Sequence, residues 1–356
     1  MPPAEGSRSE RLNRSISRGS KAMATQQQFR DFLSDIEPSK NTKEKASNAH
    51  VAARDYLASH DKFKKCHVNT FLSGSYKRDT AIRPRVRDGH EDRADVDVIV
   101  VTNHKKTDKP EEVISLLHRT LKEKYADIKK NVRSVTIVSN GVNVDIVPII
   151  APDGLDGRLF IPDRNLSEWV ETNPPKHTQW TTDTNEAADG RFKPLVKLVK
   201  WWRRENPTGF RKPKGFQVEC VVAECMEYGQ TQYQELFVGT LEGIVSRYQQ
   251  HINAGVLPFI ADPGVPGNSV TKGMTFEEFK AFHDIAKKHA KLGREAINEA
   301  DREKETEKWR KIFGERFPAC PSRTAEGLLT TAAPVSSSLS FPNKAIDPTK
   351  KPMGFA

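Results

Sequence analysis

The amino-acid sequence predicts an α+β fold in which a part that mixes strands and helices precedes a part made of helices. Runs rich in Val and Ile, which favour strands, occur between residues 67 and 150. After about residue 190, apolar side chains recur at helical spacing and no convincing strand is present. The 356 residues, 36% of them hydrophobic, are enough for one large domain or two that pack together.

The composition narrows the class of protein. Mean hydropathy is -0.66 and no apolar run approaches the length of a membrane span, so no membrane association is expected. The N-terminus has no apolar signal-peptide core and the four cysteines are scattered, which together indicate a cytoplasmic protein with reduced thiols. A net charge of +10 suits a polyanionic partner such as a nucleotide or nucleic acid, although basic proteins with neither are common.

The first part follows a segment over residues 1–24 that is aperiodic and rich in Ser and Arg, and is expected to be a disordered extension. Helical spacing then runs from Gln26 to His60, with a break at Pro38. A further helix has Pro110 in its first turn, and Asn140-Gly141 is a strong signal for a two-residue hairpin. Strands are expected over residues 67–74, 94–103, 132–138 and 142–150.

Helices dominate the second part, which we place at residues 166–318 after a first part at 25–165. Its last long helix opens with a capping box from Thr275 to Glu278 and is expected to continue toward residues 307–313. The stretch 163–180 is expected to cross between the two parts. A Ser-, Thr-, Pro- and Ala-rich tail over residues 319–356 is expected to be flexible. Helical patterns cover residues 191–206, 216–229, 233–253 and 275–300.

Three aspartates lie inside apolar strand patterns. Asp95 and Asp97 are two residues apart, so in a strand they face the same side, roughly 6.5–7 Å apart along the chain. Asp145 lies in the strand pattern over residues 142–150, where a charge is costly without a partner. Oxygen ligands of this kind suit Mg²⁺ or Mn²⁺, and three carboxylates on neighbouring strands would hold two such ions. Each aspartate alone is better explained as a solvent-facing residue at a strand end; the three together are not.

A Gly-Ser turn stands upstream of these acids. Gly74 allows the backbone to approach a phosphate without a Cβ, and Ser75 offers a backbone N–H and a hydroxyl. A helix starting here, over residues 75–80, would add a favourable dipole for an anion. A lone Gly-Ser carries no signal. A Gly-Ser pair, then Asp-x-Asp, then a distal Asp on a strand is a specific pattern. It favours a metal-binding role for the three aspartates over the role of solvent-facing residues at strand ends.

This order of motifs resembles the polymerase-β-like nucleotidyltransferases and, within them, the bacterial cGAS/DncV-like nucleotidyltransferases (CD-NTases), most closely clade D. The resemblance covers roughly residues 25–318 and the last few residues. It implies a bilobal enzyme, a nucleotidyltransferase core sheet facing a helical lobe. Such enzymes join ATP and other NTPs into cyclic di- or trinucleotides in CBASS antiphage defence. The motifs are at residues 71–84, 94–101, 142–149 and 195–206.

The resemblance also implies roles for individual residues. Asp95, Asp97 and Asp145 would bind two Mg²⁺ or Mn²⁺ ions, and Gly74 and Ser75 would hold a triphosphate. Lysines on the helix after Arg191 hold the triphosphate in family members. Lys200 matches that position best, with Lys197 as its neighbour, although a solvated lysine stripe is the ordinary fate of such a pattern.

Where relatives often place Ser and an aromatic, this chain has Gly215 and Phe216, so a Ser contact is missing. Phe216 would stack on a base or belong to the core, with equal weight. His177 would line the cleft or, more in keeping with a loop histidine, make a structural hydrogen bond.

Partners are implied in the same way. Many CD-NTase operons encode an E1/E2-like ligase that acts on the C-terminus, and others encode HORMA-domain and AAA+ regulators. The tail ending in Gly354–Ala356 is compatible with either arrangement or with an inert end. The charged loop over residues 85–95 is long for this family, and its contacts are not implied.

Two rival functions stay open at this level. A polymerase-β-like enzyme that adds nucleotides to RNA or to a small molecule would need an acceptor, whereas a cyclase needs no nucleic acid. A catalytically dead nucleotide-sensing or toxin-neutralising module would not consume NTP, but its case is weakened by the presence of all three acids.

Overall fold

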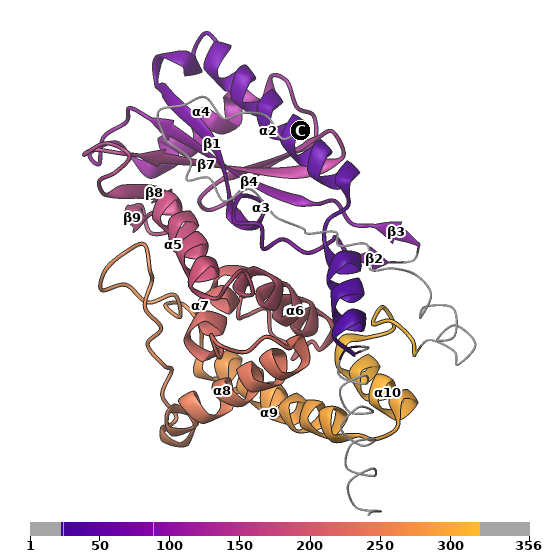
Figure 1. Cartoon of the computed structure of the whole chain (residues 1–356). Helices are drawn as coiled ribbons and strands as arrows, with labels where there is room; N and C mark the ends of the chain where they lie inside the picture. Colours follow the sequence, from indigo (N-terminus) through magenta and orange to yellow (C-terminus); the bar gives the residue numbers. More distant parts are fainter. Residues whose placement is uncertain (1–22, 24, 88, 321–356) are drawn as a thin grey trace, which may run out of the picture. The chain divides into compact units, whose positions relative to one another are not determined.

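The computed structural model of the chain describes residues 23, 25–87 and 89–320. The described residues up to Pro318 form one compact unit (Figure 1). The expected disordered extension and flexible tail therefore lie almost wholly outside the described residues, and so does the C-terminal end at Ala356.

A mixed sheet of seven strands dominates the first part of the structure (Figure 1). Five strands lie in the order β1-β4-β7-β6-β5, while β8 pairs with β7 and β9 with β8. The β4–β7 pair is parallel and the other pairs are antiparallel. A small separate hairpin joins β2 (Val86–Arg87) to β3 (His90–Glu91). The strands of the sheet are β1 (His67–Ser73), β4 (Asp95–Thr102), β5 (Ile128–Lys130), β6 (Val135–Ser139), β7 (Val142–Ile150), β8 (Leu159–Asp163) and β9 (Glu168–Thr172).

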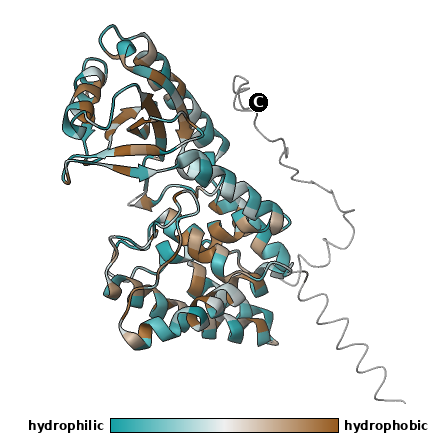
Figure 2. Cartoon of the chain, turned by 90° about the vertical axis from the view of Figure 1, so that its left-hand side faces the viewer, coloured by the Kyte–Doolittle hydropathy of each residue, from teal (hydrophilic) through white to brown (hydrophobic). Residues whose placement is uncertain are grey.

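Helices cover one face of this sheet. Ala49 of α2 (Lys40–Ser59) and Leu117 of α4 (Pro110–Lys122) belong to the same buried cluster as the even-numbered residues of β4. The odd-numbered Ile99 and Val101 belong to a second, smaller cluster. Because side chains alternate along a strand, Asp95 and Asp97 share the face that α2 and α4 leave uncovered. In Figure 2 much of the hydrophobic colour in the first part lies on strands of the sheet, which fits the buried Val and Ile side chains of β4 and β7.

Six longer helices make up the second part. They enclose the largest buried cluster, to which seven residues of α6 belong. The first described helix, residues 25–36, packs into this cluster as well: Phe29 lies 5.1 Å from Trp309, and Phe32 lies 5.1 Å from Phe313, between ring centroids. These helices are α5 (Pro174–Ala187), α6 (Phe192–Glu205), α7 (Gly215–Cys225), α8 (Tyr233–Ala254), α9 (Phe276–Asn298) and α10 (Arg302–Phe313).

Most of the predicted elements are confirmed. The helix break at Pro38 lies between residues 36 and 40, Pro110 opens α4, and Asn140 and Gly141 have φ of 50° and 75°, as a tight hairpin turn requires. The capping box of Thr275 and Glu278 is present, and the four cysteine thiols are free. The α+β class is therefore confirmed by the elements themselves.

Three expectations differ from the structure. The helix from residue 275 does not run on to residue 313, because it ends at Asn298 and Asp301 caps a new helix, α10. The stretch 163–180, expected to be an extended segment between the two parts, is not extended throughout, since the start of α5 follows β9 within it. Helix 25–36 has its core contacts in the helical part rather than under the sheet, so a division into two lobes that begins at residue 25 places this helix with the wrong neighbours. Among the described residues, no helix is long and apolar enough to cross a bilayer.

Candidate active site

The three aspartates lie on two adjacent parallel strands. In the register of β4 and β7, Asp97 is paired with Asp145, and Asp95 with Asn143. On the other side of β4, Asp97 is paired with Ser73, the last residue of β1. The Gly-Ser turn follows Ser73 directly, so one short stretch of the sheet carries the turn and all three carboxylates. The sequence pattern predicted this arrangement.

Gly74 approaches a carboxylate. A Cβ on Gly74 would lie 1.8 Å from Oδ2 of Asp97, and the residue has a φ of +67°. Both observations require glycine here. The helix expected after the turn is α3 (Gly74–Lys77), a single turn, and not a helix over residues 75–80. Its dipole is correspondingly small, so an anion at this turn depends mainly on the N–H groups of the turn itself.

Asp95 and Asp145 each keep one oxygen available. Nδ2 of Asn143 donates to Oδ1 of Asp95 at 2.9 Å. Oγ1 of Thr136 donates to Oδ1 of Asp145 at 2.8 Å, and Nδ2 of Asn131 donates to the same oxygen at 3.3 Å. Within the described residues, Oδ2 of both carboxylates makes no hydrogen bond. These neighbours orient the two carboxylates and leave the second oxygens for a ligand.

The surroundings of Asp97 disfavour its ionised form. Burial raises the pKa of Asp97 to about 6, and the negative charges of Asp145 and Asp95 add to the effect. Arg78 and Lys200 oppose this shift. A carboxylate near two others in a poorly solvated place is stable when protonated or when a cation is bound.

Carboxylate oxygens are the ligands that Mg²⁺ and Mn²⁺ prefer, so the donor set of these three aspartates fits a divalent ion. Among the described residues, however, no group of three or more His, Cys, Asp or Glu side chains is assembled around a common point that could hold an ion. The Asp97 carboxylate lies instead against Gly74. The three aspartates are therefore suitable ligands by residue type, but their carboxylates do not converge on one point in this structure.

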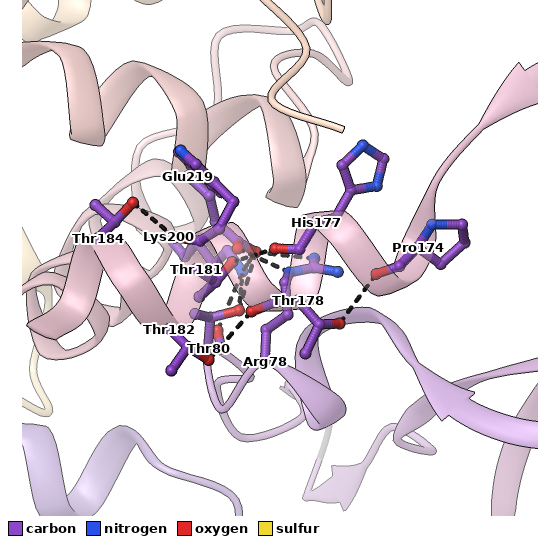
Figure 3. Close-up of polar contacts among 11 residues, drawn as sticks. Arg78, Thr80, Pro174, His177, Thr178, Thr181, Thr182, Thr184, Lys200 and Glu219 are labelled. Carbon is purple, nitrogen blue, oxygen red and sulfur yellow. Dashed lines mark hydrogen bonds and ion pairs between the residues drawn. The ribbon is translucent and has the colours of Figure 1, made fainter. Parts of the chain in front are cut away.

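A second group of polar side chains lies behind the turn, and Figure 3 shows that its contacts converge on Glu219. Glu219 of α7 is fully buried and accepts hydrogen bonds from Arg78 Nε (2.9 Å) and Nη2 (3.0 Å). It also accepts from Thr80 Oγ1 (2.9 Å) and Lys200 Nζ (2.7 Å). Burial alone would raise the pKa of Glu219, but Lys200 and Arg78 hold it at about 2. This group ties the segment after the turn to α6 and α7.

Lys200 thus contacts Thr80, five residues after Ser75, while Lys197 has other partners. Burial, with Arg78 and Lys197 nearby, lowers the pKa of Lys200. Gly215 lies beside Lys200, since a Cβ on Gly215 would be 3.6 Å from Nζ. The Lys197 ammonium contacts Glu37 at 2.7 Å and Asp79 at 3.2 Å. The basic stripe of α6 is therefore largely buried and paired, and not a solvated face.

The rings of Phe216 and His177 contact each other at a tilted angle beside this group. The centroid of the Phe216 ring lies 4.5 Å from that of His177, and the Arg78 guanidinium lies 4.9 Å from it. His177 is on α5 and not in a loop, and its Nε2 is 2.7 Å from Asp262 Oδ1. The structural hydrogen bond expected for His177 is confirmed. Phe216 is half-buried and packs against the helical core, which leaves it little freedom to stack on a base.

Sequence reasoning missed Arg78, Thr80 and Glu219. Glu219 lies in an apolar helical run, where an isolated buried acid signals a cationic partner, but nothing in the sequence says which one. Arg78 and Thr80 lie three and five residues after Ser75, which was the available signal for their place near the turn.

Comparison with known proteins identifies the family. Residues 23–185 match the model of the Second Messenger Oligonucleotide or Dinucleotide Synthetase domain. A Cyclic AMP-AMP-AMP synthase of Acinetobacter is 47% identical over 342 residues, covering 94% of this chain and 98% of that protein. A Cyclic AMP-AMP-GMP synthase of Enterobacter hormaechei is 28% identical, covering 83% and 92%. The structure is similar to CdnC in a CdnC:HORMA complex of Escherichia coli, with a TM-score of 0.64 at 21% identity, covering 82% and 98%.

Proposed function

We propose a function from the premise that the chain belongs to the bacterial cGAS/DncV-like nucleotidyltransferases, the CD-NTases. It is a nucleotidyltransferase that condenses NTPs into a cyclic oligonucleotide of the CBASS antiphage response, with release of pyrophosphate. The observation that carries the site assignment is the register of Asp97 against Asp145 on parallel strands, with Gly74 against the Asp97 carboxylate. The assignment to clade D stays a prediction.

The bond change is a phosphoryl transfer. A ribose hydroxyl oxygen of one nucleotide attacks the α-phosphorus of another, and the bond from that phosphorus to pyrophosphate breaks. Asp145 is the proposed acceptor of the hydroxyl proton, because its Oδ2 has no hydrogen bond in the described residues while Thr136 and Asn131 fix Oδ1. Ser75 and the N–H groups of the turn hold the triphosphate, and Lys200 supplies positive charge beside it.

Divalent ions, proposed as two Mg²⁺ or Mn²⁺, would be held by Asp95, Asp97 and Asp145. When bound they supply electrostatic stabilisation of the phosphate oxygens. Hydrogen bonds orient two of these carboxylates. Asn143 donates to Asp95. Thr136 and Asn131 donate to Asp145. A bound cation would offset the burial and the neighbouring negative charges that raise the pKa of Asp97.

The proposed product is a cyclic trinucleotide made from ATP. Its support is the 47% identity to a Cyclic AMP-AMP-AMP synthase, against 28% to a Cyclic AMP-AMP-GMP synthase. A HORMA-domain protein is the proposed regulatory partner, on the likeness to CdnC in its HORMA complex. AAA+ proteins and an E1/E2-like ligase acting on the C-terminus stay predictions, and the tail that a ligase would act on lies outside the described residues.

A nucleotide panel tests this function. The purified chain is incubated with labelled ATP, GTP, CTP and UTP, singly and together, with Mg²⁺ or Mn²⁺, and the products are treated with phosphatase. We expect a phosphatase-resistant product from ATP alone, absent from an Asp95→Asn/Asp97→Asn double variant. A product that forms only when RNA or a small-molecule acceptor is added would favour the rival nucleotidyltransferase. No consumption of NTP, with or without a HORMA partner, would contradict the proposal.

A further inference from the structure

We propose that Arg78, held in place by Glu219, binds the triphosphate of the nucleotide, and that Lys200 acts beside it only as a buried positive charge. This inference rests on the proposed function and assigns a residue to the same site. It differs from the sequence-based expectation, in which Lys200 is the direct ligand.

The hydrogen-bonding capacity of Lys200 is fully used. An ammonium group has three N–H donors. Nζ of Lys200 donates to Glu219 Oε1 at 2.7 Å, to the Thr80 carbonyl oxygen at 3.1 Å and to Thr80 Oγ1 at 3.0 Å. A direct bond to a phosphate would require Lys200 to break one of these three, each of which satisfies a buried group.

Arg78 is paired with Glu219 but keeps N–H donors that have no partner among the described residues. A guanidinium has five N–H donors, and Glu219 takes two of them, one on Nε and one on Nη2. For the remaining three, two of them on Nη1, the described part of the chain offers no hydrogen-bond partner. Nη1 is also not among the buried polar atoms that lack a partner, so the small exposed part of this side chain includes it. Arg78 therefore has donors for a ligand without any rearrangement.

The position of Arg78 is that of a phosphate ligand. Its backbone N–H donates to the Gly74 carbonyl oxygen at 3.1 Å, so it closes the turn proposed to hold the triphosphate. The bidentate contact with Glu219 and the Phe216 ring at 4.9 Å fix the plane of the guanidinium. A fixed guanidinium with free donors suits phosphate oxygens better than a mobile one.

The charges of the group point to an anion. Two cations, Arg78 and Lys200, share one carboxylate, Glu219, in a buried place. Glu219 therefore neutralises only one of these two cations, and the free N–H donors of the pair are those of Arg78. Burying an unbalanced charge is costly, so an arriving phosphate improves the balance.

The test measures affinity for two ligands that differ only in phosphates. The full chain is titrated in Mg²⁺ buffer with α,β-methylene ATP, which the enzyme cannot condense, and with AMP. For Arg78→Gln we expect the affinity for the ATP analogue to fall about tenfold or more and the affinity for AMP to change by less than about twofold. Arg78→Lys should fall between, because it keeps the charge and loses the fork. Lys200→Gln should weaken the ATP analogue less than Arg78→Gln does.

Arg294→Gln is the matched control. Arg294 donates from Nε and Nη2 to the two carboxylate oxygens of Glu242, the same fork, between α8 and α9. It should leave the affinities for both ligands unchanged. If Arg78→Gln does not fold, Arg78→Lys keeps the positive charge beside Glu219 and should still give a selective, smaller loss of affinity for the ATP analogue.

The outcomes separate this inference from the function. Equal weakening of the ATP analogue and AMP by Arg78→Gln would mean a structural role and overturn it, as would a larger loss with Lys200→Gln. If the wild-type chain binds neither ligand, this would contradict the proposed function and therefore also the inference about Arg78.

Discussion

Replacing Asp97 with asparagine removes one charge from the carboxylate group and keeps the size of the side chain. The pKa of Asp97 is raised to about 6 by burial and by Asp145 and Asp95. The folded chain therefore binds this proton more tightly than the unfolded chain does. The stability that the protonated group contributes is fully present below the ordinary aspartate pKa and is lost as the pH rises through about 6.

The size of this effect follows from the shift. The pKa lies about two pH units above the ordinary aspartate value, and each unit corresponds to about 1.4 kcal/mol, so the ionised Asp97 costs the metal-free fold up to about 3 kcal/mol. Asp97→Asn should be more stable than the wild type by up to this amount at about pH 7.5, and the gain should disappear toward about pH 4. The same variant should make no product.

Urea unfolding followed by circular dichroism, in buffer with a chelator, measures the difference. Added Mg²⁺ should stabilise the wild type and leave the variant much less affected, because ligand binding to the folded state adds stability. An Asp97→Asn variant that is less stable at both pH values, or equally stabilised by Mg²⁺, would refute the reasoning about this carboxylate.

Three other substitutions have clear expectations. Gly74→Ala places a Cβ 1.8 Å from the Asp97 carboxylate at a φ of +67°, so product formation should fall at least about a hundredfold and the melting temperature should drop. Glu219→Gln should destabilise the fold by about 3–5 kcal/mol in urea unfolding. Because the pKa of Glu219 is held at about 2, the wild type should lose this stabilisation as the pH falls from about 4.5 toward 2. Thr136→Val removes the 2.8 Å hydrogen bond to Asp145 and should lower the rate about tenfold with little change in ATP affinity.

The sheet and its acids were predictable because their signals are local. Alternation within each strand places Asp95 and Asp97 on one face, and the hairpin at Asn140-Gly141 fixes where β7 begins. Asp145 then falls beside Asp97 once β4 and β7 pair in parallel. Periodicity also gave α6, α8 and the start of α9 nearly to the residue.

The rest depended on contacts between distant residues. Helix 25–36 is amphipathic in either setting, and its contacts with aromatic rings of α6 and α10 place it in the helical part. Lys197 and Lys200 belong to the same basic stripe in the sequence, yet their surroundings differ. Lys197 forms an ion pair with Glu37, whereas Lys200 belongs to the cluster around Glu219. Short strands such as β5 and β8 carry too few residues for a period of two to be recognised.

The central claim is that Asp95, Asp97 and Asp145 form the catalytic site of a cyclic oligonucleotide synthase. The most direct test is mass spectrometry of the phosphatase-resistant product made from ATP and Mg²⁺ by the wild type and by single Asp→Asn variants at these positions. The account predicts a cyclic adenylate from the wild type, with the mass of a trimer, and none from any variant while the variants stay folded. A linear product with a free end, or full activity in one of the three folded variants, would contradict it.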